Sequence, residues 1–380
     1  MTDSLLLSPV AYEDFIKSYR ESQPLHISRK ESNHFSRLLS VEGIKKYVTD
    51  NTAIHPDVLV VNSRSPVKTS DYTNDLKHVD AVKLFQHHER GGTVVVNEVH
   101  KKFAPVGELC AQVNRDFQLR CQANAYLSPP GNQGFHSHYD THDVFVLQLA
   151  GRKTFRFYPS DIELPFPDDT FHPDAVTGAE PVEQVELSAG DTLYIPRGIV
   201  HDALASEDEP SLHITLGVYP YVVRDLLQEM IQVAAERDVN LRRSVDLNSA
   251  TEAPAVLKKL FEEFFTEEVY AEAVSRLADE AAVDCYRAPD STVDEAEAEF
   301  TAGTVVMVNH AAIHGSEHRD GVFKLRLAGQ VIQFSEPYND AVEELLKAKK
   351  VTVGSLPGLD EEQQLALCHQ LVTAGVVDIC

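Results

Sequence analysis

Short apolar runs, broken by glycine and proline, dominate the chain between Thr93 and Pro220. Runs of this length with such punctuation favour β-strands over helices. We expect strands at Thr93–Val99, Gln122–Leu127, Asp143–Ala150, Thr154–Tyr158, Thr192–Ile195 and Leu212–Tyr219. Many short strands joined by tight turns are typical of a β-barrel or a β-sandwich.

Apolar residues at helical spacing take over after Pro220. The pattern predicts amphipathic helices at Val222–Arg237 and Pro254–Val283, with leucines and phenylalanines on more than one face. The remainder mixes strands and helices and suits a small α+β domain of winged-helix type. Its predicted elements are strands at Gly303–Val308 and Phe323–Phe334 and helices at Asn339–Lys347 and Glu361–Ala374.

The charge of the chain limits the partners that it can attract. Among 380 residues there are 34 basic and 59 acidic side chains, which gives a formal net charge of −25. Such a surface repels phosphate, so we do not expect a nucleic-acid partner. It attracts cationic chains, and a basic protein or peptide is the expected substrate.

The sequence indicates a cytoplasmic protein. No apolar run approaches the roughly 18 residues that a membrane-spanning helix needs, and the first ten residues do not have the pattern of a secretory leader. The cysteines are odd in number and show no Cys-x-x-Cys spacing, so free thiols are expected rather than a disulfide framework or a zinc site. They are Cys110, Cys121, Cys285, Cys368 and Cys380.

A candidate metal site comes from three residues. His138 and Asp140 are two positions apart on a predicted strand, where side chains i and i+2 share a face. His201 follows a glycine-aspartate turn, a strand and a proline-glycine bend, and it offers a third ligand. Two imidazoles and one carboxylate on one face of a metal leave open positions, an arrangement that suits ferrous iron and oxygen chemistry.

A His-x-Asp pair arises by chance in many chains, so its neighbours matter. Asn124 and Lys153 lie on or beside predicted strands on either side of the pair. If Lys153 points inward, it needs an anionic partner, which a bound dicarboxylate would supply. The alternative is an outward, solvated lysine.

Other histidines permit competing interpretations. His136 could form a His-x-His site with His138, although Asp140 would then have no role. We expect His142 and Asp143 to be turn and supporting residues rather than ligands. Three further histidines are predicted to lie in a polar hairpin, with a secondary metal site as the alternative; they are His310, His314 and His318.

The segments that carry this chemistry resemble the JmjC ribosomal-oxygenase group, also called cupin-4. The resemblance rests on Asn124–Gly131, Gln133–Phe135, His138–Asp140, Phe145–Leu149, Gly151–Lys153 and Gly190–His201. It implies that His138, Asp140 and His201 ligate Fe(II), and that Lys153 binds the distal carboxylate of the cosubstrate 2-oxoglutarate with Asn124 nearby. O2 would be the second cosubstrate.

The sequence departs from the group's pattern at three positions. Ser137 stands where proline is frequent, and Phe155 stands where tryptophan is common. These two differences concern packing. Gly217 stands where several relatives carry a small polar residue near the substrate, so the identity of the substrate residue is left open.

The resemblance also implies an architecture. We expect an α+β protein with a double-stranded β-helix, or jelly-roll, followed by a helical dimerisation region and a winged-helix-like domain. The corresponding boundaries are 1–92 for a mixed α/β flank, 93–221 for the catalytic core, 222–284 for the dimerisation region and 285–380 for the last domain. A homodimer would cover the apolar faces of the two long helices.

The expected activity is the 2-oxoglutarate-dependent hydroxylation of a side chain of a protein or peptide, with histidine or arginine of a ribosomal protein as the first residues to test. Three alternatives stay open: demethylation of N-methyl-lysine, tailoring of a biosynthetic peptide, and a non-catalytic cupin scaffold. The sequence reveals no aromatic cage for a methylated ammonium, which ranks demethylation lower.

Overall fold

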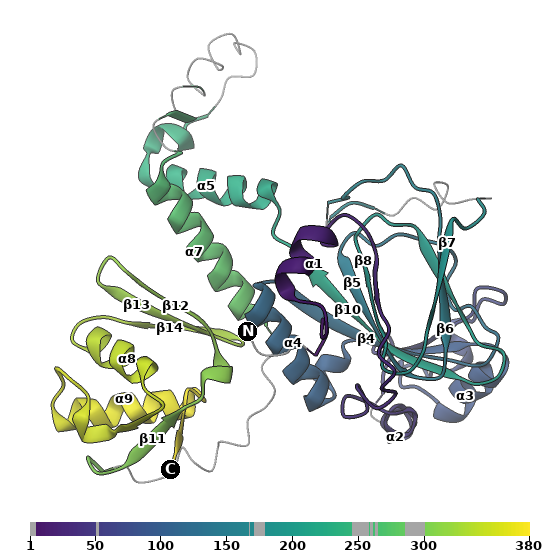
Figure 1. Cartoon of the computed structure of the whole chain (residues 1–380), viewed down its shortest axis with the longest axis horizontal. Helices are drawn as coiled ribbons and strands as arrows, with labels where there is room; N and C mark the ends of the chain where they lie inside the picture. The colour runs from purple at the N-terminus through teal and green to yellow at the C-terminus, as the bar shows by residue number, and fades with distance from the viewer. Residues whose placement is uncertain are drawn as a thin grey trace. The chain divides into compact units, whose positions relative to one another are not determined.

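The computed structural model describes residues 5–50, 53–166, 168–170, 179–244, 258, 261–262, 265–285 and 301–380. The chain divides into two compact units (Figure 1). The first comprises Met1–Cys110 and Cys121–Pro220, and the second comprises Ala111–Arg120 and Tyr221–Cys380. Within the described part, no helix combines the length and the apolar character needed to cross a membrane.

The first unit contains a large sheet of seven strands, in which β5 pairs antiparallel with both β8 and β10. The centre of this sheet is almost wholly apolar because it is covered on both faces. In spatial order its strands are β1 (Leu25–Ile27), β8 (Thr192–Ile195), β5 (Asp143–Ala150), β10 (Ser211–Tyr219), β4 (Arg120–Ser128), β3 (Thr93–Val96) and β2 (Val58–Val61).

A second, three-stranded sheet of β7 (Glu183–Leu187), β6 (Lys153–Phe157) and β9 (His201–Ala205) lies on the other side of the first unit from β5, β8 and β10 (Figure 1). Apolar side chains from both sheets form one buried cluster, which joins the sheets as a sandwich. The jelly-roll predicted from the sequence is therefore confirmed. The cluster consists of Val144, Val146, Phe155, Phe157, Leu187, Leu193 and Ile195.

The first unit contains α1 (Tyr12–Ser18), α2 (Val41–Thr49) and α3 (Ala81–Glu89), and α4 (Ala104–Phe117) begins in the first unit and ends in the second. Phe15 of α1 packs against Tyr194 of β8 with their ring centroids 4.8 Å apart. The side chains of Ser40 and Asp80 accept hydrogen bonds from the first turns of α2 and α3, which fixes where these helices begin.

The second unit begins with a helix pair, α5 (Val223–Arg237) and α7 (Glu267–Val283). The pair packs through Met230 and Val233 of α5 and Val269 and Ala273 of α7. The predicted helix Pro254–Val283 is not continuous: Lys258, Phe261 and Glu262 are helical, but Phe265 and Thr266 are not. Thr266 is extended and its side chain accepts a hydrogen bond from the amide of Val269, so that α7 begins at Glu267. Residues 254–257 lie outside the described residues.

The rest of the second unit is a mixed α+β fold. One sheet has the order β15 (Lys350–Thr352), β11 (Val305–Val308) and β16 (Val377–Ile379), and the other has the order β12 (Ile313–Arg319), β13 (Val322–Leu327) and β14 (Gln330–Phe334). The single strand predicted at Phe323–Phe334 is in fact the hairpin β13–β14. It turns at Gly329, whose φ of 78° is easily adopted by glycine.

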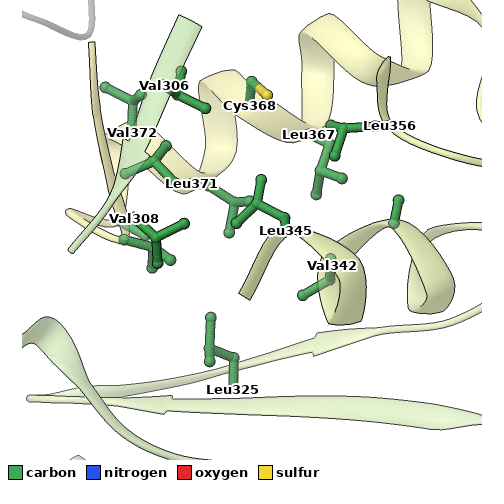
Figure 2. Packing of buried hydrophobic residues seen from close by; sticks show 14 of the residues in the cluster. Val306, Val308, Leu325, Val342, Leu345, Leu356, Leu367, Cys368, Leu371 and Val372 are labelled. Atoms are coloured by element: carbon green, nitrogen blue, oxygen red, sulfur yellow. The ribbon is translucent and has the colours of Figure 1, made fainter. Parts of the chain in front are cut away.

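Two helices, α8 (Tyr338–Lys347) and α9 (Glu361–Thr373), complete the core of this fold. Figure 2 shows Leu345 of α8 and Leu371 of α9 directed into the same interior as Val308 of β11. All three side chains are buried. The hydrophobic periodicity of both helices is therefore explained by this shared core.

Candidate active site

His138, Asp140 and His201 lie together in the first unit. One ligand atom from each residue can be chosen so that all three atoms are within 4.8 Å of one another. Nε2 of His201 is 3.8 Å from Oδ2 of Asp140. The structure thus brings together the three residues that the sequence predicted as metal ligands, and the separation suits a single ion between them.

The backbone beneath this cluster differs from the prediction. His138 and Asp140 do not lie on a strand, because His138 forms only an isolated bridge in the connection between β4 and β5. The amide of His138 donates to the carbonyl of His201 at 2.9 Å, and the amide of His201 donates back at 2.7 Å. This reciprocal pair of bonds sets the two imidazoles side by side, with ring centroids 4.7 Å apart.

The proton positions on both imidazoles follow from their hydrogen bonds. Nδ1 of His138 lies 2.8 Å from the carbonyl of His136, and Nδ1 of His201 lies 2.9 Å from the carbonyl of Ile199. A carbonyl oxygen only accepts, so each Nδ1 carries the proton and each lone pair is on Nε2. Burial and the neighbouring His138 lower the pKa of His201, which favours the neutral form that a metal requires.

Asp202 anchors the segments that carry the two histidines. Its buried carboxylate accepts two hydrogen bonds from the guanidinium of Arg156, at 2.7 and 2.9 Å. It also accepts from the hydroxyls of Tyr158 at 2.8 Å and Ser137 at 2.9 Å. Ser137 precedes one candidate ligand and Asp202 follows the other, so this network ties both to β6. The sequence analysis missed Asp202, although a buried carboxylate beside a ligand is a usual position for such support.

The three residues open into a cavity of about 350 Å³, large enough for a small organic acid together with a side chain. Strands of both sheets contribute to it. Among its lining residues are Thr93, Gln122, Asn124, Tyr126, Phe135, His138, Asp140, His142, Lys153, Phe155, His201, His213, Thr215, Gly217 and Tyr219.

Lys153 points inward into this cavity from the first position of β6, as the sequence allowed. Its side chain is buried, and the ammonium group donates to the hydroxyl of Ser128 at 3.1 Å. Burial lowers the pKa of Lys153 to about 7. Among the ion pairs of the described residues none includes Lys153, so an anionic ligand is the natural partner of its charge.

The side chains around Lys153 are neutral. Burial lowers the pKa of His213 well below its usual value, and the positive charge of Lys153 lowers it further. The His213 ring stacks on Tyr126 with centroids 4.8 Å apart, and its buried Nδ1 has no hydrogen-bond partner among the described residues. Burial raises the pKa of Tyr126 to about 12, so its hydroxyl stays protonated.

Asn124, the other residue expected near the cosubstrate, also lines the cavity. Its Oδ1 accepts a hydrogen bond from the amide of Glu98 at 2.9 Å, which fixes the amide side chain. The sequence analysis missed Tyr126 and Ser128. Both follow Asn124 at intervals of two on β4, and this alternation could have identified them.

The other residues considered near the candidate ligands take different positions. His136 is exposed and does not line the cavity, so the structure gives no support to a His136–His138 site. Asp143 accepts from the hydroxyl of Tyr194 at 2.8 Å and from the amide of Arg197 at 3.0 Å, which is a supporting role. His142 lies in the bend just before β5, as expected, and its side chain lines the cavity.

Two of the three histidines of the last domain lie in a hairpin, as predicted, because β12 pairs antiparallel with β13. His314 and His318 lie on β12, and His310 lies in a short 3-10 helix before it. His314 is buried, and its Nδ1 is 2.6 Å from Oδ1 of Asn114. Within the described ranges, no metal-binding arrangement includes these three residues.

Known proteins with similar sequences contain the domain in which these residues lie. Residues 98–226 match the JmjC domain. The chain is 30% identical over 297 residues to the "Bifunctional lysine-specific demethylase and histidyl-hydroxylase NO66" of Aedes aegypti, an alignment that covers 72% of this chain and 46% of that protein. The protein of the same name from Drosophila grimshawi is 31% identical over 258 residues, covering 64% and 35%. The chain therefore spans less than half the length of these curated relatives.

Solved structures with a similar fold match this chain over almost its full length. YcfD of Escherichia coli, described as a ribosomal oxygenase, matches with a TM-score of 0.57 at 16% identity, covering 98% of this chain and 99% of YcfD. A structure of YcfD in complex with cobalt and 2-oxoglutarate matches with a TM-score of 0.55 at 15% identity, with 98% of each chain covered. At this identity the likeness concerns the fold. The predicted resemblance to JmjC-type ribosomal oxygenases is confirmed, and residues 98–226 of this chain belong to the JmjC family of domains.

Proposed function

We propose that this protein is an Fe(II)- and 2-oxoglutarate-dependent oxygenase that hydroxylates a side chain of a protein. The observation that carries the proposal is one cavity that contains both the His138–Asp140–His201 cluster and the buried ammonium of Lys153. A metal with open positions and a cation for a distal carboxylate are the two parts that this chemistry needs.

The residues of the cavity fit these two groups. Two imidazoles whose Nδ1 atoms face carbonyl oxygens and whose Nε2 atoms remain for a metal, together with one carboxylate, form the donor set that ferrous iron accepts. When bound, iron and 2-oxoglutarate supply the activation of O2 and the hydroxylation of a C–H bond. The protein holds the metal with His138, Asp140 and His201, pairs the distal carboxylate with Lys153, and orients the target in a cavity shielded from water.

The proposed substrate is a basic protein segment. The excess of 25 negative charges favours encounter with cationic chains and disfavours nucleic acid. The match to YcfD, described as a ribosomal oxygenase, supports ribosomal proteins as the first candidates, and the NO66 name supports histidine as the first residue to test. Arginine is the second.

Demethylation of N-methyl-lysine is the second candidate, because the names of the NO66 relatives include a lysine-specific demethylase. The chemistry would begin in the same way, with hydroxylation of the N-methyl group and loss of formaldehyde. The lining residues favour hydroxylation, since Asp140 is the one carboxylate among them and it is committed to the proposed metal. Release of formaldehyde from a methylated lysine peptide would reverse this ranking.

The assembly is also part of the proposal. Apolar side chains on α5 and α7 are exposed, among them Val223 at 72% and Tyr270 at 50%. A groove of about 330 Å³ beside them is lined by Tyr221, Leu226 and Leu277. These features support a homodimer formed through a helical region at 222–284, followed by a winged-helix-like domain at 285–380. Light scattering at micromolar protein should report the mass of two chains.

The same proposal keeps the other boundaries expected from the sequence, 1–92 for the flank and 93–221 for the catalytic core. None of the five cysteines, all of them described residues, forms a disulfide, which is consistent with a reducing compartment and supports the proposed cytoplasmic location.

The test of the activity combines turnover with product analysis. The purified protein, loaded with Fe(II) and given 2-oxoglutarate and basic ribosomal-protein peptides, should produce succinate and add the mass of one oxygen to a peptide. The matched control is Asp140→Ala, which removes one proposed ligand and should abolish both products. Absence of succinate and of oxidised peptide with the iron-loaded wild-type protein would overturn the proposed function, and equal activity of the Asp140→Ala variant would overturn the assigned site.

A further inference from the structure

Gly217 creates a space in the cavity that another residue fills. Gly217 lies on β10, opposite Val144 of β5, and lines the cavity. A Cβ atom at this position would lie 2.8 Å from both Cδ2 and Nε2 of His142. No ordinary contact is that short, so the imidazole occupies the volume in which any other side chain at position 217 would begin.

The imidazole of His142 is held firmly in that space. It stacks on the ring of Tyr219, with centroids 4.6 Å apart and planes inclined by 22°. The hydroxyl of Tyr219 lies 3.4 Å from Oε1 of Gln122, a further residue of the cavity wall. The ring is thus fixed between an aromatic face and a glycine, which reduces the entropy that a contact with a ligand would cost.

The nitrogens of the His142 ring form no hydrogen bond with the part of the chain that the structure describes. Among the hydrogen bonds of the described residues, none involves the imidazole of His142. An imidazole offers a hydrogen-bond donor or an acceptor at each nitrogen. His142 follows the candidate ligand Asp140 by two residues and shares its cavity, so a group bound to the imidazole would be close to the metal site.

We propose that His142 recognises the substrate: its imidazole forms a hydrogen bond with the side chain that enters the cavity and so directs the reacting C–H bond toward the metal site. The inference rests on the proposed function and adds a specificity-determining residue to it. In this chain His142 takes the place of the small polar residue that, by the resemblance, relatives carry at the position of Gly217.

The cavity also limits the kind of side chain that it accepts. Among the described lining residues Asp140 alone has a carboxylate, while Gln122, Asn124 and Thr215 offer neutral polar groups. A guanidinium or ammonium group inside the cavity would have no counter-charge apart from the metal-binding aspartate. The geometry therefore favours an uncharged, hydrogen-bonding side chain as the target, with the basic residues of the substrate outside the cavity.

The test uses basic twenty-residue peptides that differ only at the central residue, which is histidine, asparagine, arginine or alanine. With the iron-loaded protein and 2-oxoglutarate, we expect KM for the histidine or asparagine peptide to be about tenfold below that for the alanine peptide, the usual contribution of one or two hydrogen bonds. In His142→Ala the difference between these peptides should fall to less than about threefold, and His142→Asn, which keeps a donor and an acceptor, should restore part of it.

A double-mutant cycle separates recognition from a structural role. Gly217→Ser alone should displace the imidazole and raise KM, because the added Cβ collides with it. In a His142→Ala background the same serine has room and places a hydroxyl group in the vacated space, so it should lower KM. This reversal of sign is not expected of residues that only support the fold.

The outcomes distinguish the two proposals. If the wild-type protein forms succinate and hydroxylates one of the peptides but His142→Ala keeps the full preference for its central residue, the role of His142 is refuted and the proposed function stands. A wild-type preference for the arginine peptide would also refute it. If the wild-type protein forms no succinate with any peptide, the proposed function itself fails.

Discussion

The binding of 2-oxoglutarate should depend steeply on pH because of Lys153. Its ammonium group is desolvated in the cavity, and this burial lowers its pKa to about 7. Only the charged form can pair with the distal carboxylate of the cosubstrate. Binding therefore requires a proton that is lost from the free protein as the pH rises through 7, whereas the two carboxyl groups of 2-oxoglutarate stay ionised over the same range.

The size of the effect follows from this value. With a pKa near 7, the charged fraction of Lys153 falls from about 0.9 at pH 6 to about 0.1 at pH 8, so the apparent Kd should rise about tenfold. An exposed lysine with an ordinary pKa of about 10.4 would remain charged throughout, and the Kd would hardly change. The two cases differ by a factor that titration calorimetry resolves easily.

The assay titrates 2-oxoglutarate into metal-loaded, oxygen-free protein between pH 6 and pH 8, so that the candidate ligands are held by the metal and do not titrate. At pH 7, in buffers of different ionisation enthalpy, we expect uptake of about half a proton for each molecule bound. Lys153→Arg is the matched control, since its guanidinium stays charged, and its profile should be flat. A wild-type Kd that is independent of pH, with no proton uptake, would show that Lys153 is not the cation that binds the carboxylate.

Three further predictions concern the ligands and the stability of each unit. Asp140→Ala should lose tight binding of Co²⁺, followed by visible absorption, while its thermal unfolding in the absence of metal stays close to wild type; unchanged Co²⁺ binding would contradict the assignment. Asp202→Ala should lower the free energy of unfolding in urea by about 3 kcal/mol, because it leaves the Arg156 guanidinium and two hydroxyls without their acceptor. A double variant that also carries Arg156→Met should recover part of this loss of stability. A loss below about 1 kcal/mol for Asp202→Ala would argue against the network. Burial lowers the pKa of His314 to about 4, so the unfolded chain binds the proton more readily between pH 4 and 6.5, and acid should destabilise the second unit. At pH 5 the loss is about 2 kcal/mol relative to pH 8, and His314→Gln should be less sensitive, whereas equal sensitivity of both proteins would refute the role.

The sequence predicted the parts of the fold that depend on local pattern. Strands such as Asp143–Ala150 show their apolar runs directly, and the structure has the same bounds. Prediction from the sequence failed where contacts between residues far apart in the chain decide the structure. Glu183–Leu187 was not recognised as a strand because its residues are mostly polar and exposed, and only its pairing with β6 makes it one. The start of α7 was misplaced because the cap at Thr266 is weaker in the sequence than the apolar pattern before it.

In the candidate active site, too, local patterns were recognised in the sequence and long-range contacts were not. The spacing of His138 and Asp140 pointed to a metal, but the partner of the first histidine lies 63 positions away, and the bridge between His138 and His201 leaves no local pattern. The resemblance marked Gly217 as a departure near the substrate, but the sequence could not show which residue fills the space left by the missing side chain. The absence of a side chain there becomes informative only when the ring of His142 is seen to fill the space.

The reciprocal amide-to-carbonyl bonds between His138 and His201 have a consequence for how the site can change over evolutionary time. Main-chain atoms make these bonds, so a substitution beside either histidine removes none of the atoms that form them. Ser137 adds a side-chain hydrogen bond to Asp202 beside this pair, so a substitution there should weaken the support of the pair without removing the main-chain bonds. Main-chain pairing of this kind fixes the backbone under both candidate ligands, so substitutions at neighbouring positions should change the support of the site rather than the distance between the two backbone segments.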